Sequence, residues 1–148
     1  GATAAPPVAE FASLLTDPDL GAVFIAPSNP WLSIDPILAI PSLRAALLST
    51  TAPVIAISPI VGGKAIKGPT AKIMGELGIP VSAAAVARHY GELLDGYILD
   101  DVDRPEAAAL VAEGLAVVAT NTVMRTLNDR IALAGFALDF ARGFAVRE

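Results

Sequence analysis

The stretch AVFIAPSNPWLSIDPIL, residues 22–38, contains an apolar run, a polar turn and the start of a helix. Residues 22–27 are nearly all apolar, which is typical of a strand covered by helices on both faces. Ser-Asn-Pro follows at residues 28–30, and Pro36 suits the first turn of a helix that has Asp35 as its N-cap. This succession predicts one βα unit of a parallel sheet.

Three more apolar runs repeat the pattern, at residues 53–60, 96–101 and 115–122. Helical segments lie between the runs and at both ends of the chain, with a first helix near 8–15 and a last near 126–143. We therefore expect a single α/β domain over residues 1–148, a three-layer Rossmann-like arrangement with a mostly parallel sheet of about four strands.

Individual residues mark the ends of the expected helices. Ser82 and Asp103 are candidate N-caps, and Gly78 and Gly114 are candidate helix ends. Residues 1–7, rich in alanine and proline, are expected to be a frayed end or a remnant of an expression tag.

Composition excludes several classes of function. The 148 residues include no cysteine and one histidine, which argues against disulfides, thiolate metal sites and a nucleophilic triad. The net charge of −5, without a basic run, argues against a nucleic-acid partner. Because no apolar run reaches the roughly 18–20 residues that span a bilayer, we expect a cytoplasmic protein without a membrane partner.

The turn after the first apolar run is a candidate binding loop. Ser28 offers a hydroxyl and Asn29 an amide, and Pro30 restricts the backbone, so an anion or a sugar could bind with little further ordering. Parallel sheets bind ligands beyond the carboxyl ends of their strands, where this loop is expected. Ser, Asn and Pro are also ordinary turn residues, and this simpler interpretation is favoured on sequence alone.

A second candidate loop follows the second apolar run. Ser58 ends the run, Gly62 and Gly63 allow close approach of a ligand, and Lys64 and Lys67 supply positive charge. The segment matches neither of the usual glycine-rich nucleotide patterns. A Gly-Gly turn with solvated lysines explains it equally well.

The histidine and the acidic residues each allow two interpretations. His89 lies at the border of the apolar face of its expected helix, with Arg88 on the opposite flank, and a histidine there usually bonds to a neighbouring group. The acidic residues around the third apolar run could hold magnesium, although helix capping and solvation explain them as well. This acidic group comprises Asp95, Asp100, Asp101 and Asp103.

Four quoted stretches resemble the 2-phospho-L-lactate transferase family, which builds the deazaflavin coenzyme F-420. They are APSNPWLSIDPILAIPSLRAAL (26–47), APVIAISPIVGGKAIKGPTAKIMGELG (52–78), VSAAAVARHYGELLDGYILDD (81–101) and VVATNTVMRTLNDRIALA (117–134). Together they are similar to the later half of the family's chain.

The resemblance implies a phosphotransfer reaction. In the family, a guanosine-diphosphate-linked lactate or enolpyruvate gives its phosphoester portion to the terminal hydroxyl of the deazaflavin riboside, and GMP is released with the help of magnesium. The resemblance also implies that the Ser-Asn-Pro loop lines the substrate cleft. We expect the following substrate- and nucleotide-binding residues: Ser28, Asn29, Pro30, Ser33, Ser58, Gly62, Gly63, Lys67, Arg88 and His89.

Two departures from the family pattern matter. The family begins with a glycine-rich phosphate loop and acidic residues for the metal and the acceptor, and residues 1–21 resemble neither. We therefore assign no catalytic residue and no metal ligand, and expect this chain alone to be inactive. Asp35 also replaces a small residue, usually glycine, and its carboxylate would compete with a bound phosphate.

A different class of function remains open. The chain could be a non-catalytic nucleotide-binding or assembly module, related to the sugar-nucleotide-binding regulatory proteins that share the fold. The sequence SNPWLSIDPIL (28–38) is more similar to the transferases. Uncovered apolar surfaces on half a molecule would favour a homodimer.

Overall fold

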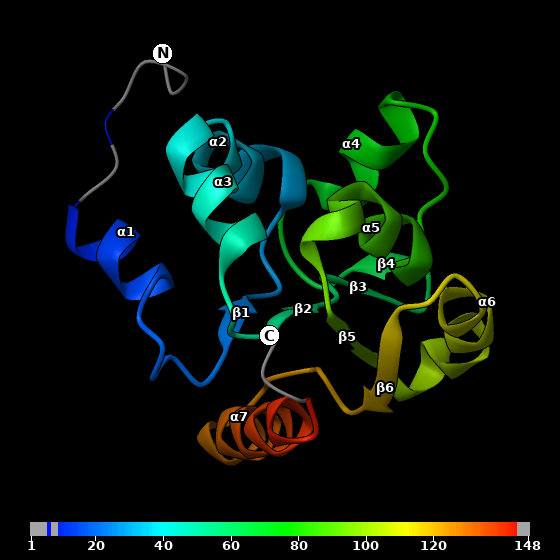
Figure 1. Ribbon diagram of the computed structural model, residues 1–148. Helices are drawn as coiled ribbons and strands as arrows, with labels where there is room; N and C mark the ends of the chain where they lie inside the picture. The colour runs from blue at the N-terminus through cyan, green and yellow to red at the C-terminus, as the bar shows by residue number, and fades with distance from the viewer. Residues whose placement is uncertain (1–5, 7–8, 145–148) are drawn as a thin grey trace.

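Four parallel strands form the centre of the structure, a computed structural model that describes residue 6 and residues 9–144 (Figure 1). The strands are β1 Val23–Ile25, β2 Val54–Ile57, β5 Gly96–Asp100 and β6 Ala116–Thr120, in the spatial order β1-β2-β5-β6. Each lies within one of the four predicted runs, so the parallel α/β sheet is confirmed. The expectation for residues 1–7 falls, except for Pro6, outside the described part of the chain.

Helices and short turns connect the strands and cover the sheet. Their bounds are α1 Ala9–Leu15, a π-helical turn η2 Pro30–Ile34, α2 Asp35–Leu38, α3 Pro41–Ser49, α4 Thr70–Glu76, α5 Ala83–Tyr90, the 3₁₀ turns η3 Gly91–Leu93 and η4 Asp101–Glu106, α6 Ala107–Ala112 and α7 Leu127–Arg142. The single helix expected after Pro36 is divided, because the segments Pro30–Leu38 and Pro41–Ser49 meet at 88°.

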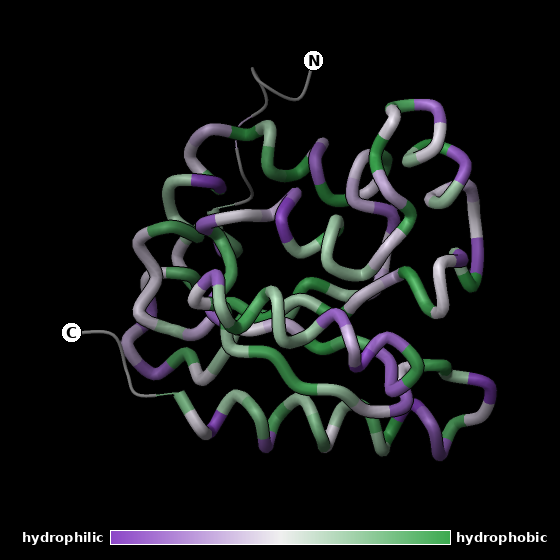
Figure 2. The backbone as a smooth tube through the Cα atoms, turned by 90° about the vertical axis from the view of Figure 1, so that its right-hand side faces the viewer, coloured by the Kyte–Doolittle hydropathy of each residue, from purple (hydrophilic) through white to green (hydrophobic). Residues whose placement is uncertain are grey.

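The side chains of β2 show how the layers form. Val54 and Ala56 point into the larger core cluster, which includes residues of α3 and α5, whereas Ile55 and Ile57 pack against α7 on the other face. Figure 2 shows the path of α7 below the apolar strands. The three-layer arrangement is therefore confirmed. Among the described residues, α7 covers one face of the sheet, and α3 and α5 lie on the other.

Several predicted helix ends are confirmed. The Ser82 hydroxyl accepts a hydrogen bond from the Ala85 N–H at 3.1 Å and caps α5. Gly78 and Gly114 follow α4 and α6 with φ of 69° and 93°, the left-handed conformation that glycine adopts without strain. The last helix begins after Thr126, whose side chain caps it.

Two predicted N-caps are wrong. Asp35 is inside a helical segment that begins earlier, because Asn29 caps it: the Asn29 Oδ1 accepts a hydrogen bond from the Leu32 N–H at 3.0 Å. The 3₁₀ turn η4 is capped by Asp100, so Asp103 lies inside it, as does Pro105. In both cases the aspartate contacts a residue far along the chain instead of its own helix.

A small hairpin follows β2. Strands β3 Ile60–Val61 and β4 Lys64–Ala65 pair antiparallel, and Gly62 and Gly63 form the turn with φ of 57° and 71°. Two successive positive φ values are typical of tight hairpin turns.

Among the described residues, no single helix has the length and apolar character needed to cross a membrane.

We predict that Gly96→Ala destabilises the fold by about 1–3 kcal/mol through overpacking. A Cβ at Gly96 would lie 2.8 Å from Phe140 Cε1, 2.9 Å from Phe144 Cζ and 3.2 Å from Ile55 Cγ1. Gly135→Ala in α7 is the control, because its Cβ would meet nothing within 4 Å and should add about 0.5–1 kcal/mol. Urea unfolding followed by circular dichroism measures both, and equal stability of Gly96→Ala and the wild type would contradict the packing argument.

Candidate functional site

A small pocket opens at the carboxyl ends of the strands. It has a volume of about 140 Å³ and is lined by residues that follow β1, β2 and β6, together with the segment after the hairpin. The lining includes Pro27, Ser58, Lys67, Thr122 and Met124. The structure therefore brings Ser58 and Lys67 together, beside the residue that precedes Ser28.

The Ser-Asn-Pro loop leads from β1 into the π-helical turn. The Asn29 carbonyl accepts from the N–H groups of Ser33 at 2.9 Å and Ile34 at 3.4 Å, and buried Pro30 occupies the first position of the turn. The Asn29 Nδ2 is buried and has no hydrogen-bond partner among the described residues. Because an unpaired buried donor costs about 1–3 kcal/mol, this loop is a strong candidate for contact with a further group.

Ser58 and the hairpin glycines have structural roles in the second loop. The buried Ser58 hydroxyl donates to the Ile60 carbonyl at 2.8 Å and accepts from the Ile60 N–H at 3.1 Å. The Gly62 N–H donates to both carboxylate oxygens of Asp103 at 3.0 Å. This N–H is therefore already used, whereas Lys67 is exposed at the pocket.

Two buried aspartates hold the loops in place. Asp100 at the end of β5 accepts from the Thr122 N–H at 2.8 Å and from its hydroxyl at 3.1 Å. Asp103 holds the hairpin through Gly62. Burial raises the pKa of Asp103, although the Gly62 N–H acts in the opposite direction.

His89 lies against the helical segment after the Ser-Asn-Pro loop. Its Nε2 is 2.9 Å and 3.0 Å from the two oxygens of Asp35, and its ring centroid is 4.8 Å from that of Trp31. A histidine at the border of an apolar helix face was expected to bond to a neighbouring group, and His89 does so with the Asp35 carboxylate. Asp35 thus connects the segment to α5.

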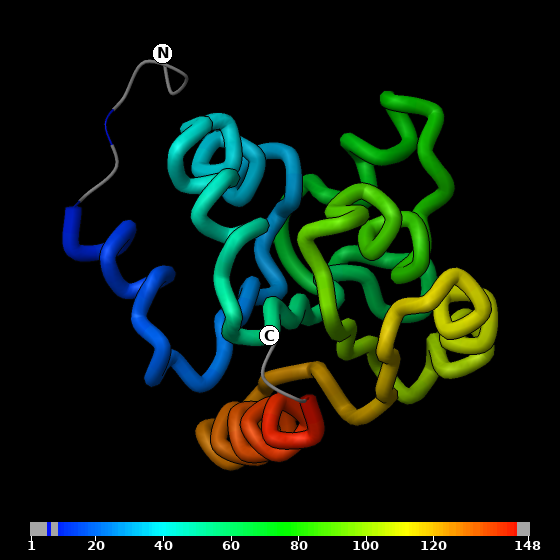
Figure 3. The backbone as a smooth tube through the Cα atoms, viewed as in Figure 1, coloured from blue at the N-terminus to red at the C-terminus, as the bar shows by residue number. Residues whose placement is uncertain are grey.

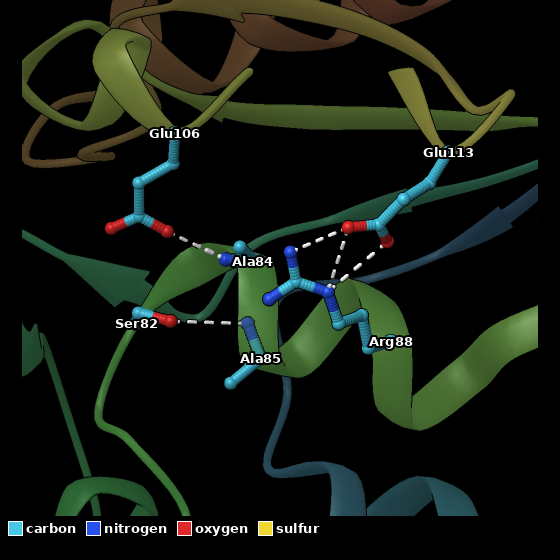
Figure 4. A network of polar contacts seen from close by, with 6 residues as sticks. All are labelled: Ser82, Ala84, Ala85, Arg88, Glu106 and Glu113. Atoms are coloured by element: carbon cyan, nitrogen blue, oxygen red, sulfur yellow. Dashed lines mark hydrogen bonds and ion pairs between the residues drawn. The ribbon is translucent and has the colours of Figure 1, made fainter. Parts of the chain in front are cut away.

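Arg88 points to a different part of the molecule (Figure 4). Its guanidinium forms a salt bridge with Glu113 at 2.6 Å, and this hydrogen bond raises the pKa of Arg88 and lowers that of Glu113. Both residues border a hollow of about 350 Å³ that also includes Leu94 and Leu115, which precede β5 and β6. The structure therefore does not bring Arg88 together with the loops at the carboxyl ends.

The carboxylates near β5 do not suit a magnesium ion. Asp100 and Asp103 are buried and accept backbone N–H groups, Asp101 pairs with Arg104, and Asp95 accepts from the Val54 N–H at 2.8 Å. Within residues 6 and 9–144, no group of three or more acidic, histidine or cysteine side chains could hold a metal. Because Mg²⁺ needs oxygen ligands that are open to it, we derive no step through this ion.

Sequence reasoning missed the part of the pocket that follows β6. Thr122, Val123 and Met124 line it, and Asp100 positions Thr122. The sequence signal for this part was the polar end of the fourth run, Thr120, Asn121 and Thr122. The carboxyl ends of parallel strands lie at the same edge of the sheet, where such sheets bind ligands. The residues at the end of each strand are therefore candidates for the lining of a binding site.

We predict a pH-dependent contribution of Asp103 to stability. Because burial raises its pKa in the folded state, its contribution is full below about pH 4 and is lost as the pH rises through the raised pKa. Asp103→Asn keeps an oxygen for Gly62 and removes this dependence. Urea unfolding from pH 3.5 to 7 measures it, with exposed Asp101→Asn as control. A stability difference between Asp103→Asn and the wild type that stays constant with pH would contradict the prediction.

Several known proteins have sequences that are similar to most of this chain. The transferase family model "2-phospho-L-lactate transferase CofD" matches residues 1–132. The 2-phospho-L-lactate transferase of Methanocaldococcus jannaschii is 35% identical over 118 residues, covering 80% of this chain and 36% of the relative. The phosphoenolpyruvate transferases of Streptomyces griseus and Kitasatospora aureofaciens are 37% and 35% identical, covering 80% and 95% of this chain.

The length of these relatives limits what the match covers. The chain spans 36%, 38% and 44% of the M. jannaschii, S. griseus and K. aureofaciens proteins. The match includes the loop after β1, the hairpin and the segment after β6, and therefore every element that lines the pocket. On this evidence, the chain belongs to the 2-phospho-L-lactate transferase family.

Proposed function

We propose that this chain forms the substrate-positioning part of a phosphotransferase of coenzyme F-420 biosynthesis. The donor is a guanosine-diphosphate-linked lactate or enolpyruvate, and the acceptor is the deazaflavin riboside. The names of the relatives support both versions, since some are 2-phospho-L-lactate transferases and others phosphoenolpyruvate transferases. The cytoplasmic location expected from the sequence remains a prediction.

The pocket between the strand ends carries the proposal. Lys67 supplies a positive charge there, and Thr122 and Ser58 also line the pocket. Its volume of about 140 Å³ is below the roughly 300–1,000 Å³ of sites that enclose a whole ligand. We therefore assign it one phosphate group of the donor.

The reaction needs positioning and charge neutralisation. The acceptor oxygen attacks the phosphorus that carries the lactyl or enolpyruvyl group, the phosphoanhydride bond breaks, and GMP leaves with the bonding electron pair. The proton of the acceptor hydroxyl passes to a base. Lys67 would stabilise charge on the transferred phosphoryl group, as an ammonium does without forming a covalent intermediate.

The proposal places the base outside the described residues. At the end of β5, Asp100 and Asp103 are buried and already accept hydrogen bonds from backbone N–H groups. Asp101, between them, is paired with Arg104. Asp35 is bonded to His89. We therefore propose that this chain alone positions a phosphate and does not catalyse transfer.

A non-catalytic role is the alternative. In that role the chain is a nucleotide-binding or assembly module, related to sugar-nucleotide-binding regulatory proteins. Asp100 and Asp103 both accept hydrogen bonds within the fold. This observation favours a non-catalytic module as much as it favours an incomplete enzyme. Restoration of transfer by the rest of a family-length chain distinguishes the two, because a regulatory module would not restore it.

We predict that the purified chain forms no product by itself. The assay combines the chain with magnesium, guanosine-diphospho-lactate and deazaflavin riboside, and chromatography measures GMP and the phospholactyl product. The complete M. jannaschii enzyme is the positive control, and the enolpyruvyl donor is tested in parallel. Product formation at a rate comparable to the complete enzyme would place the catalytic centre in this chain and contradict the proposal.

We also predict that Lys67→Ala weakens the binding of GDP by roughly 3- to 10-fold, equivalent to about 0.7–1.4 kcal/mol. The reason is the loss of one ammonium–phosphate contact. Lys72→Ala is the matched control, because Lys72 is an exposed lysine of α4 paired with Glu76. Isothermal titration measures both variants. Equal weakening by the two would show a general charge effect and not a contact at the pocket.

A further inference from the structure

A polar contact connects the helical segment after β1 to the helix α5. The segment Pro30–Leu38 and α5 lie on the face of the sheet opposite α7 (Figure 3). The His89 Nε2 atom of α5 is 2.9 Å and 3.0 Å from the two carboxylate oxygens of Asp35. The ring centroids of Trp31 and His89 are 4.8 Å apart. We call Trp31, Asp35 and His89 together the His89 cluster.

The segment transmits the position of Asp35 to the Ser-Asn-Pro loop over one helical turn. The Asp35 N–H donates to the Pro30 carbonyl, and the Asn29 carbonyl accepts from the Ser33 N–H at 2.9 Å. The Asn29 Oδ1 accepts from the Leu32 N–H at 3.0 Å. The Asn29 amide is thus oriented through its oxygen, while its buried Nδ2 has no partner among the described residues. A displacement of Asp35 would therefore change the direction of this amide.

Other contacts hold the segment less specifically. Its apolar side chains Trp31, Ile34 and Leu38 are only partly buried against the core, and apolar packing has no preferred direction. Among the described residues, the contact between Asp35 and His89 is the one side-chain hydrogen bond that joins residues 30–38 to another helix or strand. This contact therefore fixes where the segment lies on the core.

We propose that His89 and Asp35 are positioning residues for the Ser-Asn-Pro loop. The pair fixes the segment Pro30–Leu38 against α5, and the segment in turn orients the Asn29 amide. His89 thus acts through Asp35, which differs from the direct substrate contact that the sequence suggested for it. The consequence for substrate binding rests on the proposed function, whereas the effect on the loop does not.

The strength of the pair depends on the charge of His89. An imidazolium forms a stronger hydrogen bond to a carboxylate than a neutral imidazole does. The side chains of His89 and Asp35 are only 25% and 36% exposed, so water and salt screen their attraction in part. Histidine side chains change their charge between about pH 5 and 8. We therefore expect the loop to be held more firmly at the acidic end of this range.

The groups around the pair do not compete for it. The other charged side chains of α3, α5 and η3 form two ion pairs, Arg44–Glu92 and Arg88–Glu113. The Tyr90 ring centroid is 5.7 Å from that of His89. Burial, and after it the charge of Asp35, raises the pKa of the Tyr90 phenol. Tyr90 therefore stays neutral between pH 5 and 8, and His89 is the group whose charge changes there.

The first test uses the single histidine and the single tryptophan of the chain. Proton NMR follows the charge of His89 from about pH 5 to 8.5, and fluorescence of Trp31 reports on the segment over the same range. We expect one transition with a common midpoint in both signals, and His89→Gln to remove it from the fluorescence. A Trp31 emission that does not follow the titration of His89 would overturn the proposal.

The second test measures the order of the loop without a ligand. Hydrogen–deuterium exchange, read by mass spectrometry and corrected for intrinsic rates, gives the protection of residues 28–38. At pH 5.5 we expect Asp35→Asn and His89→Gln each to lower this protection about 3- to 10-fold, the effect of one partly exposed charge-assisted hydrogen bond. The double variant should lower it no further, because both changes remove the same contact.

Glu92→Gln is the matched control for the exchange measurement. Glu92 lies three residues after His89, and its ion pair with Arg44 at 3.2 Å does not include the segment. We expect this variant to change the protection of residues 28–38 less than twofold. Equal losses in Glu92→Gln and His89→Gln, or a double variant whose loss equals the sum of the two single losses, would overturn the proposal. So would wild-type protection that is the same at pH 5.5 and 8, a comparison that needs no variant.

The consequence for the substrate is measured separately, with GDP as the probe. Isothermal titration compares His89→Gln with the wild type at the same pH, so the titration of GDP itself cancels. We expect weaker binding by about 3- to 10-fold at pH 5.5 and by less than twofold at pH 8, where the wild-type histidine is mostly neutral. Equal affinities at pH 5.5 would overturn the role of the loop in binding. Absence of GDP binding to the wild type would contradict the proposed function, and the exchange measurements stand in either case.

Discussion

The carboxylates at the end of β5 are the constraint on which the arrangement of the loops depends. Asp100 holds the segment after β6 through Thr122, and Asp103 holds the hairpin after β2 through Gly62. Both aspartates are buried, and a buried carboxylate that loses its donors is strongly destabilising. The two loops therefore cannot leave the carboxyl edge of the sheet without a large loss of stability. This constraint preorganises the pocket between them.

The same hydrogen bonds decide which groups remain for a ligand. The Gly62 N–H and the Ser58 hydroxyl resemble anion-binding groups in the sequence, but each already has a partner within the fold. Lys67 is exposed at the pocket, and the Asn29 Nδ2 has no partner among the described residues. One set of polar groups thus holds the loops in place, and a smaller set remains available to a ligand.

Local signals predicted much of the fold, and long-range contacts explain where prediction failed. The four apolar runs gave the parallel strands, and Ser82 caps a helix three residues away. Asp35 and Asp103 looked like helix caps, yet their partners lie 54 and 41 residues along the chain. Arg88 was among the expected substrate- and nucleotide-binding residues, but it lies away from the loops at the carboxyl ends. On a helix, however, adjacent residues such as Arg88 and His89 point in different directions.

The last helix shows the limit of hydrophobic pattern alone. Spacing predicted α7 correctly, but the residues that it buries include small ones, Ala137 and Ala141, while Leu127, Ile131 and Leu138 stay exposed. Small side chains let the helix approach the sheet closely at Gly96. A Cβ atom at Gly96 would collide with the Phe140 ring. The large residues therefore add little to the packing of this sheet. Of these three, Leu138 lines a groove together with Phe24 of β1, which is the edge strand of the sheet among the described residues.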